Sequence, residues 1–378
     1  MQRLIRVAFA NRTAAETGGA EESLALLIQN MPPEFAPHAL LFEDGIYAER
    51  LRGLGIPVHI VPMAQRFLTT TREKPDPRGL LDAPHALASV RELLRREQID
   101  VVHTNTVKAH LIVVPAAKSL GIASVVHLRD MVPGIGRNIV GFAAARASRR
   151  IAISRAVDRW YGIKNTRVIA NPIDLSQYRR ELDRRAARLS LGIPGDEPLI
   201  SIVGRINRWK GHDRFLRIAK KLLERRPARF AIVGEARNRD ADFLPELREL
   251  SKSLGIDEYV RFISWREDPR EAYAATDVLC NCSEREPFGR TMIEAAACGV
   301  PSVAFDDGGA PDIIVDGETG FLIPAGDEDG FTAAVEKLLD PTLRERMAIA
   351  AKARANQFDS TNHALQVANV LREAIRRP

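Results

Sequence analysis

Two carboxylates stand eight positions apart in the stretch EPFGRTMIE, which runs from Glu286 to Glu294. Gly289 opens a loop, and apolar side chains then recur at helical spacing until Gly299 and Pro301. Glu286 is therefore expected in a loop and Glu294 one turn inside a helix. The unpaired N–H groups at such a helix start suit a phosphate, and carboxylates accept hydrogen bonds from hydroxyl groups. A ligand with both groups, such as a sugar nucleotide, fits this pattern; a capped helix with one solvated glutamate is the plainer alternative.

A second group of chemically useful residues lies in LISIVGRINRWKG, residues 199–211. Gly204 and Arg205 end an apolar strand there, and Lys210 and Gly211 stand at the start of the next predicted helix. When a bond to a nucleoside diphosphate breaks, negative charge develops on the phosphates, and a guanidinium fork and an ammonium group can neutralise it. A basic surface patch is the alternative. Because Arg205 directly follows a buried strand and a glycine, the functional interpretation is favoured.

Four further motifs follow a fixed order along the chain. They are GGAEES at residues 18–23, VIANPID at 168–174, FAIVGE at 230–235 and DDGGAPDIIVDGETGFLI at 306–323. Together with the two stretches above, this order resembles the retaining glycosyltransferases of family 4 (glycosyl transferases group 1), which adopt the GT-B fold. The resemblance covers nearly the whole chain. It implies a hexosyltransferase that moves a sugar from a nucleoside-diphosphate sugar to a hydroxyl of a glycan or lipid-linked acceptor, as in polysaccharide biosynthesis, with retention of the anomeric configuration and without a metal.

The resemblance also assigns roles to residues of the donor site. Glu294 is expected on the ribose hydroxyls, Glu286 on the donor sugar and Arg290 near the phosphates. Glu286 has the chemistry of a nucleophile or of a group that stabilises an oxocarbenium-like sugar, but an orienting role is preferred. The residues expected to bind the donor are Gly18, Gly19, Gly204, Arg205, Lys210, Gly234, Trp265, Glu286, Phe288, Gly289, Arg290, Thr291 and Glu294. The residues expected to take part in catalysis are His127, Glu286, Arg205 and Lys210.

The first half of the chain departs from the family pattern at the end of its fifth predicted strand. Many family members have a histidine followed by an aspartate there, whereas this chain has SVVHLRD. His127 and Arg129 are two positions apart, so both side chains leave the same face of the strand. His127 is expected to contact the sugar, Arg129 is the alternative, and a purely structural histidine stays open. The candidates for contact with the acceptor are His103, Asn105 and Arg129.

The chain has 378 residues, of which 45% are apolar, so it can bury large cores and is long enough for two domains. Strands and helices alternate in both halves, which predicts two doubly wound, Rossmann-like domains facing across a cleft. The expected domains are residues 1–175, with a final helix at 361–377 packing back onto them, and residues 176–360. The polar segment 171–197 is expected to be a linker, and the segment 64–81 is a candidate lid over the acceptor.

A formal net charge of +6 is compatible with phosphorylated substrates, a membrane surface or nucleic acid. Without interleaved aromatic residues or a known module, nucleic acid is not expected as a partner. Between positions 129 and 167 basic residues far outnumber acidic ones, so the first domain could contact anionic lipid, although a solvated helix face is the simpler interpretation. No apolar run approaches the roughly 20 residues that span a bilayer. A cytoplasmic protein, with peripheral membrane contact left open, is therefore expected.

Other functions are compatible with paired α/β domains to different degrees. A dinucleotide-dependent oxidoreductase would need G-x-G-x-x-G after a strand, and neither strand end has that spacing. The D-x-D pairs Asp240/Asp242 and Asp327/Asp329 stand at predicted helix starts, where carboxylates are ordinary caps, so no metal and no cofactor are expected. A sugar-nucleotide epimerase or phosphorylase on the same fold, and a non-catalytic sugar-nucleotide-binding protein, stay open.

Overall fold

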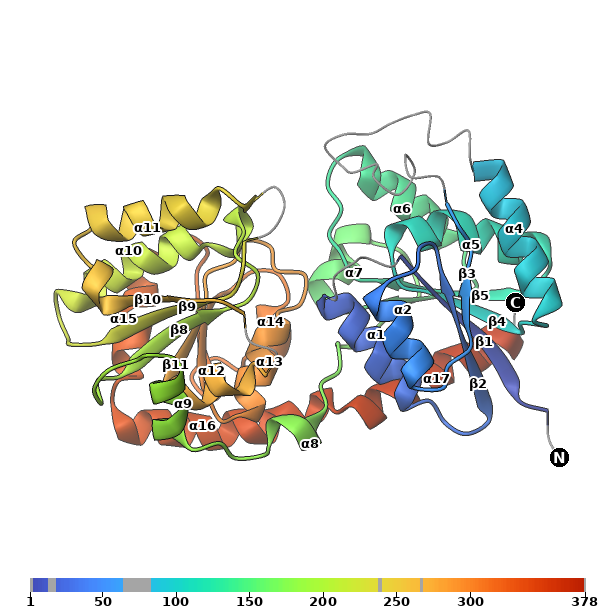
Figure 1. The fold of residues 1–378 in the computed structure, drawn as a ribbon. Helices are drawn as coiled ribbons and strands as arrows, with labels where there is room; N and C mark the ends of the chain where they lie inside the picture. Colours follow the sequence, from blue (N-terminus) through green and yellow to red (C-terminus); the bar gives the residue numbers. More distant parts are fainter. Residues whose placement is uncertain (1–2, 13–17, 64–82, 237–239, 266–267, 377–378) are drawn as a thin grey trace. The chain divides into compact units, whose positions relative to one another are not determined.

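The computed structural model describes residues 3–12, 18–63, 83–236, 240–265 and 268–376. The segment 64–81, the candidate lid, lies outside the described residues. The chain divides into two compact units, unit 1 with residues 1–172 and 360–378, and unit 2 with residues 173–359 (Figure 1). Each unit contains one parallel sheet with helices between successive strands, so the prediction of two Rossmann-like domains is confirmed.

Unit 1 is built on a seven-stranded parallel sheet with the order β3-β2-β1-β4-β5-β6-β7. Its strands are β1 (Ile5–Asn11), β2 (Phe35–Leu41), β3 (Val58–Ile60), β4 (Val101–Thr104), β5 (Ala123–Leu128), β6 (Arg149–Ala152) and β7 (Thr166–Val168). Its helices are α1 (Gly19–Gln29), α2 (Ile46–Gly53), α4 (Ala83–Arg96), α5 (Val107–Ser119), α6 (Ile135–Ala145), α7 (Arg155–Tyr161) and α17 (Ser360–Arg376). The near-continuous apolar character of these strands follows from helices covering both faces of the sheet.

The two faces of this sheet take alternate residues of the same strand. Val7 and Phe9 of β1 pack with α1, α2 and α17, whereas Ala8 and Ala10 pack with α4 and α5. Successive strand side chains point to opposite faces, so one strand supplies both cores. The last helix, α17, buries Val367 and Leu371 in the first of these cores and so belongs to unit 1 (Figure 1).

Unit 2 is built on a six-stranded parallel sheet with the order β10-β9-β8-β11-β12-β13. Its strands are β8 (Leu199–Val203), β9 (Arg229–Val233), β10 (Val260–Ile263), β11 (Val278–Asn281), β12 (Ser302–Phe305) and β13 (Gly320–Ile323). Its helices include α8 (Leu175–Tyr178), α9 (Arg184–Ser190), α10 (His212–Leu223), α11 (Phe243–Ser253), α12 (Arg270–Ala275), α13 (Arg290–Ala297), α14 (Ala310–Ile313), α15 (Glu328–Lys337) and α16 (Pro341–Ala355). The strand order reverses between β8 and β11, and such a switch point is where doubly wound sheets bind ligands.

The segment 171–197, expected to be a linker, is instead largely part of unit 2. It forms α8 and α9, and Arg184 of α9 donates to both oxygens of the buried Asp277 carboxylate, at 2.6 and 2.8 Å. Ala187 and Ile193 are buried. The segment is polar because α9 lies on the surface of unit 2. Its Arg184 forms an ion pair with Asp277, which directly precedes β11.

Among the described residues, no helix combines the length and the apolar character that crossing a membrane requires.

Candidate active site

The sequence-predicted Glu286 and Lys210 meet at the switch point of unit 2. Glu286 lies in the loop after β11, and Lys210 ends the 3-10 turn Arg208–Lys210 that follows β8. The Lys210 ammonium contacts Oε2 of Glu286, and the Ser283 hydroxyl donates to the same oxygen at 3.2 Å. No described residue donates to Oε1 of Glu286, although the residue is only 8% exposed. One carboxylate oxygen is thus held by the protein, and the other is left for a hydroxyl donor.

Two glycines let the loops of this site approach one another more closely than side chains would allow. Gly211, with φ +73°, lies against Cys282, so that an added Cβ would stand 2.2 Å from the Cys282 carbonyl oxygen. Gly308, with φ +60°, lies against Glu286 in the same way, at 2.1 Å from its carbonyl oxygen. The next residue, Gly309, donates its N–H to that oxygen at 2.8 Å. The close approach of the Gly308–Gly309 turn therefore fixes the backbone of Glu286, and Gly211 packs in the same way on Cys282.

Glu294 is buried one turn inside α13 and accepts hydrogen bonds from its neighbours. Arg290 Nε donates to Oε1 at 2.7 Å, and the Tyr273 hydroxyl donates to Oε2 at 2.7 Å. Burial, and next the neighbouring Glu294 carboxylate, raise the pKa of Tyr273 well above its usual range, so this hydroxyl keeps its proton. Each carboxylate oxygen has a second lone pair, so Glu294 can still accept from a ligand. Sequence reasoning missed Tyr273, which lies 21 residues earlier on α12.

Arg205 is exposed directly after β8 and forms no hydrogen bond or ion pair with another described residue. A Cβ added to the preceding Gly204 would stand 3.7 Å from Cγ2 of Thr291, which lies in the first turn of α13. The strand end that carries Arg205 and the start of α13 are therefore neighbours. The N-cap of α13, Gly289, offers no side chain to the first N–H groups, and the first turn contains no acidic residue. These amides can face an anion.

The other predicted donor residues differ in what they expose. Gly234 ends β9 against Gly204, where an added Cβ would stand 1.9 Å from the Gly204 carbonyl oxygen. The Phe288 side chain is buried against the ring of Phe358, at 6.0 Å between ring centroids, so only its backbone can meet a ligand. Trp265, after β10, is 39% exposed.

In unit 1, Gly18 and Gly19 lie at the start of α1. Gly18 is the N-cap, and its N–H donates to Glu21 Oε2 at 3.1 Å. The other oxygen of Glu21 accepts from Asn11 Nδ2 at 3.2 Å. Glu21 thus caps the helix and joins it to the end of β1.

His103, Asn105, His127 and Arg129 form one buried hydrogen-bonded network at the ends of β4 and β5. The Arg129 guanidinium donates to Asn105 Oδ1, to Asn171 Oδ1 at 2.6 Å and to His127 Nδ1 at 3.4 Å. His103 Nε2 lies 3.2 Å from the same His127 nitrogen. The structure therefore brings together all four residues predicted for this end of unit 1.

His127 is neutral and fully buried in this arrangement. A guanidinium only donates, so His127 Nδ1 accepts and the proton of its neutral ring is on Nε2. Burial, and next the charge of Arg129, hold the pKa of His127 well below 6.5. The ring of His363 from α17 lies over it, with centroids 6.1 Å apart. The predicted contact of His127 with a sugar stays a prediction, and no surface of His127 is open for it here.

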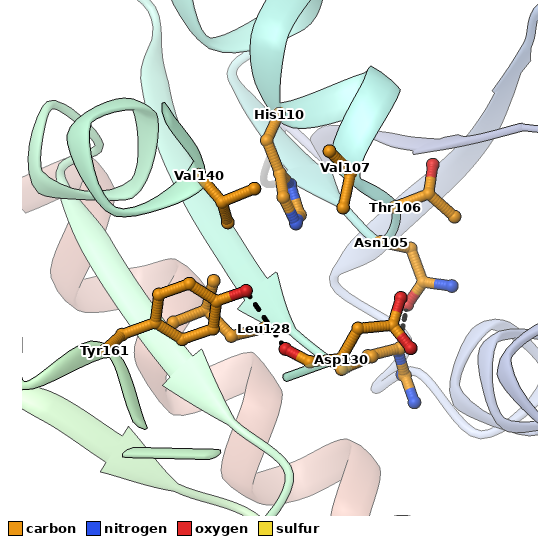
Figure 2. A pocket seen from close by; sticks show the side chains of 9 residues that line it. Asn105, Thr106, Val107, His110, Leu128, Asp130, Val140 and Tyr161 are labelled. Atoms are coloured by element: carbon orange, nitrogen blue, oxygen red, sulfur yellow. Dashed lines mark hydrogen bonds between the residues drawn. The ribbon is translucent and has the colours of Figure 1, made fainter. Parts of the chain in front are cut away.

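A pocket lies beside this network, and Figure 2 shows the side chains that line it. They are Asn105, Thr106, Val107, His110, Leu128, Arg129, Asp130, Val140 and Tyr161. The Tyr161 hydroxyl donates to the Asp130 carbonyl at 3.0 Å, and His110 Nδ1 lies 2.8 Å from Thr104 Oγ1. The predicted Asn105 and Arg129 border this pocket, whereas His103 and His127 are not among its lining residues. Sequence reasoning missed His110, although its position one turn into a helix after a strand end matches that of Glu294.

Both D-x-D pairs lie at helix starts, but Asp242, the N-cap of α11, makes no side-chain hydrogen bond to that helix, so only the second pair includes a helix cap. Asp327 accepts from the Gly330 N–H at 2.8 Å, and Asp329 pairs with Lys221 at 2.9 Å. Within the described ranges, the one group of side chains close enough to share a metal lies elsewhere, on β2, on β3 and just after α4. It consists of His38, His59 and Glu97, with ligand atoms within 4.8 Å of one another.

The chain has two doubly wound parallel sheets, and each has polar and charged side chains gathered at the carboxyl ends of its strands. This is the architecture of the GT-B glycosyltransferases. Residues 183–354 match the family model described as Glycosyl transferases group 1, and residues 47–177 match Glycosyltransferase Family 4. The D-inositol 3-phosphate glycosyltransferase of Nocardia farcinica is 31% identical over 346 residues, which is 87% of this chain and 75% of that protein. The chain belongs to the group 1 glycosyltransferases of family 4.

Other relatives match over shorter stretches. The D-inositol 3-phosphate glycosyltransferase of Kribbella flavida is 35% identical over 208 residues, 52% of this chain. The match spans about half the length of that protein, 49%.

Solved structures share the fold over nearly the whole chain. HepE of Anabaena in complex with UDP superimposes with a TM-score of 0.84 at 25% identity, covering 97% of this chain and 100% of that one. Sucrose-phosphate synthase from Thermosynechococcus elongatus superimposes with a TM-score of 0.80 at 17% identity, covering 99% and 100%. At that identity the second comparison shows the fold alone.

Proposed function

We propose that this chain transfers a hexose from a nucleoside-diphosphate sugar, with UDP as the first nucleotide to test, to a hydroxyl of an acceptor. The observation that carries the proposal is the convergence of Lys210, Glu286 and the uncapped start of α13 at the switch point of unit 2, beside the exposed Arg205. HepE, which is similar to this chain, has been crystallised with UDP and with UDP-glucose. This likeness supports UDP as the starting choice.

In the proposed reaction, unit 2 binds the donor and stabilises the departing diphosphate. Arg205 has no protein partner among the described residues, so it can meet the phosphates without breaking an existing ion pair. Lys210 has three donors and uses one on Glu286, so it can keep that contact and still reach a phosphate oxygen. The N–H groups of α13 add their partial positive charge. Fixed donors of this kind stabilise charge that develops as the bond breaks.

Glu286 is proposed to orient the sugar through Oε1, and Glu294 to accept from the ribose hydroxyls through its remaining lone pairs. We propose retention of the anomeric configuration and independence of metal, as the family resemblance implies. The acceptor is proposed to bind against unit 1 beside the pocket that Asn105 and Arg129 line, which by itself has room for about one water-sized group such as a hydroxyl. Relatives named for D-inositol 3-phosphate make phosphorylated polyols the first acceptors to test.

The test begins with thermal shifts against UDP, GDP and ADP. A nucleotide at 100 times its dissociation constant stabilises the folded state by about 2.7 kcal/mol, which is several degrees for a domain of this size. The nucleotide that gives this shift is then offered as its glucose conjugate together with phosphorylated polyols, and the anomeric configuration of the product is read by NMR. No shift with any nucleotide overturns the donor assignment. A shift without any turnover indicates a binding protein, and conversion of the donor to an epimeric nucleotide sugar without an acceptor indicates an epimerase.

A further inference from the structure

Helix α6 of unit 1 exposes its large apolar side chains and buries its small ones. Ile135, Ile139 and Phe142 are 78%, 47% and 61% exposed. Their spacing, four and then three residues, places them on one stripe of the helix. The buried positions of the same helix are Val140, Ala143 and Ala144. A helix that served only the core of unit 1 would turn the larger side chains inward.

Basic and aromatic groups flank this stripe. The Arg146 guanidinium lies 3.1 Å from the centroid of the Phe142 ring, and that of Arg137 lies 5.6 Å from the centroid of the Trp160 ring. Trp160, from α7, is half-buried and donates its indole N–H to the Val132 carbonyl at 3.0 Å. The apolar stripe is therefore bordered by two cations and by aromatic rings that tolerate both water and hydrocarbon.

The sequence around the stripe is basic, although Arg149 pairs with Glu373 of α17 at 3.9 Å. Residues 131–157 contain no aspartate or glutamate, and they contain Arg137, Arg146, Arg149, Arg150 and Arg155. Burial next to Arg149 lowers the pKa of Arg150, whose guanidinium donates to carbonyl oxygens at the end of α6. This part of unit 1 therefore carries a positive surface potential, and bringing another positively charged surface close to it is electrostatically unfavourable.

The stripe, which we call the α6 surface (Ile135, Ile139 and Phe142 with Arg137 and Arg146), needs a partner that is apolar at its centre and anionic around it. A second copy of the chain docked on the same surface would bring arginine against arginine, which is unfavourable. A bilayer that contains anionic lipid has the required chemistry, because its acyl chains accept apolar side chains and its phosphates accept guanidinium groups. We propose that α6 lies in the interface of an anionic membrane, with the apolar stripe inserted and the two arginines at the lipid phosphates.

This docking would place the acceptor pocket next to the membrane, because Val140 of the same helix lines that pocket (Figure 2). The inference itself rests on the exposure and charge of α6 and does not depend on glycosyl transfer.

The experiment is co-sedimentation of the full chain with vesicles. Vesicles of phosphatidylcholine alone are compared with vesicles of phosphatidylcholine and phosphatidylglycerol in equal parts, at low and at high salt. The wild-type chain is expected to bind the anionic vesicles and to be released by salt. The variant I135S/I139S/F142S is expected to bind them at least about thirtyfold less, since burial of each of these side chains contributes to partitioning. The variant R137E/R146E is expected to lose the preference for anionic lipid.

The matched control is L189S/I349S, which removes equally exposed apolar side chains from unit 2, where Leu189 is 72% and Ile349 67% exposed. It is expected to bind vesicles like the wild type. The melting temperature and the nucleotide-induced shift of each variant show that it is folded. A wild-type chain that stays in the supernatant, or a folded α6 variant that binds as the wild type does, overturns the proposal. A wild-type dimer that the α6 variant dissociates would instead make this surface a protein interface.

Discussion

Replacing Arg205 with alanine tests whether this guanidinium acts in catalysis or only stabilises the fold. Arg205 is exposed and has no partner within the described part of the chain. Its removal should therefore change the free energy of unfolding by no more than about 0.5 kcal/mol, the usual range for surface substitutions. If the guanidinium meets the departing diphosphate, the whole effect of the substitution should fall on catalysis.

The size of that effect follows from the kind of bond that is lost. A hydrogen bond to a charged group contributes about 1.5–3 kcal/mol, and each 1.36 kcal/mol changes a rate tenfold, so turnover should fall roughly 10- to 150-fold. The loss should appear in kcat, because the phosphates gain charge as the bond breaks. Arg205→Lys should recover only part of it, since an ammonium group lacks the planar fork.

The assay measures release of the nucleoside diphosphate in the presence of an acceptor, with kcat and KM determined separately. Arg208→Ala is the control, because Arg208 stands three positions away, carries the same charge and pairs on the surface with Glu246 at 2.6 Å. It should retain turnover within about twofold. Wild-type turnover in a folded Arg205→Ala variant would refute the assignment, and so would an equal loss in the control.

Three further predictions concern the same protein. Lys210→Ala and Glu286→Gln should show a coupling energy of about 1–2 kcal/mol in a double-mutant cycle of urea unfolding, because the pair is mostly buried; additive effects would contradict the contact. Burial lowers the pKa of His212 to about 4, so the unfolded chain, with a pKa near 6.5, binds the proton first. The stability present above the unfolded pKa is thus lost as the pH falls, by about 1.4 kcal/mol at roughly pH 5.5. His212→Phe should remove this part of the acid dependence of urea unfolding. Finally, turnover should survive dialysis against EDTA and should not rise more than about twofold when Mg²⁺ or Mn²⁺ is returned; a larger rise would sink metal independence.

The fold could be predicted because each strand of the two sheets corresponds to a short run of apolar residues in the sequence. LISIV and RFAIV form β8 and β9 almost as the sequence spells them, since helices cover both faces of each parallel strand. The meeting of Lys210 with Glu286 follows from the same topology, because β8 and β11 are neighbours at the switch point although the two residues lie 76 positions apart. Strand order, and not local pattern, brings these residues together.

What the sequence could not predict are contacts made by elements that return from elsewhere. Period-two alternation predicts His127 and Arg129 on one side of the sheet, and their side chains do meet, at 3.4 Å, although Arg129 follows the end of β5. The alternation does not say that α17 will bring His363 over His127. The longer Arg129 side chain reaches past this cover to Asn171 and to the edge of the pocket. Of two residues that look equivalent in sequence, one is enclosed and the other borders a cavity.

The orientation of helix α6 also could not be predicted from the local sequence pattern. Its sequence, IGRNIVGFAAA, is apolar on most sides, so periodicity alone does not tell which side is buried. In the structure the buried side takes Val140, Ala143 and Ala144, and the bulkier Ile135 and Phe142 remain in water. Exposing large side chains while burying small ones forgoes hydrophobic stabilisation that exchanging their positions would recover. Selection for the stability of unit 1 alone does not favour that arrangement, whereas selection for an apolar partner outside the chain does.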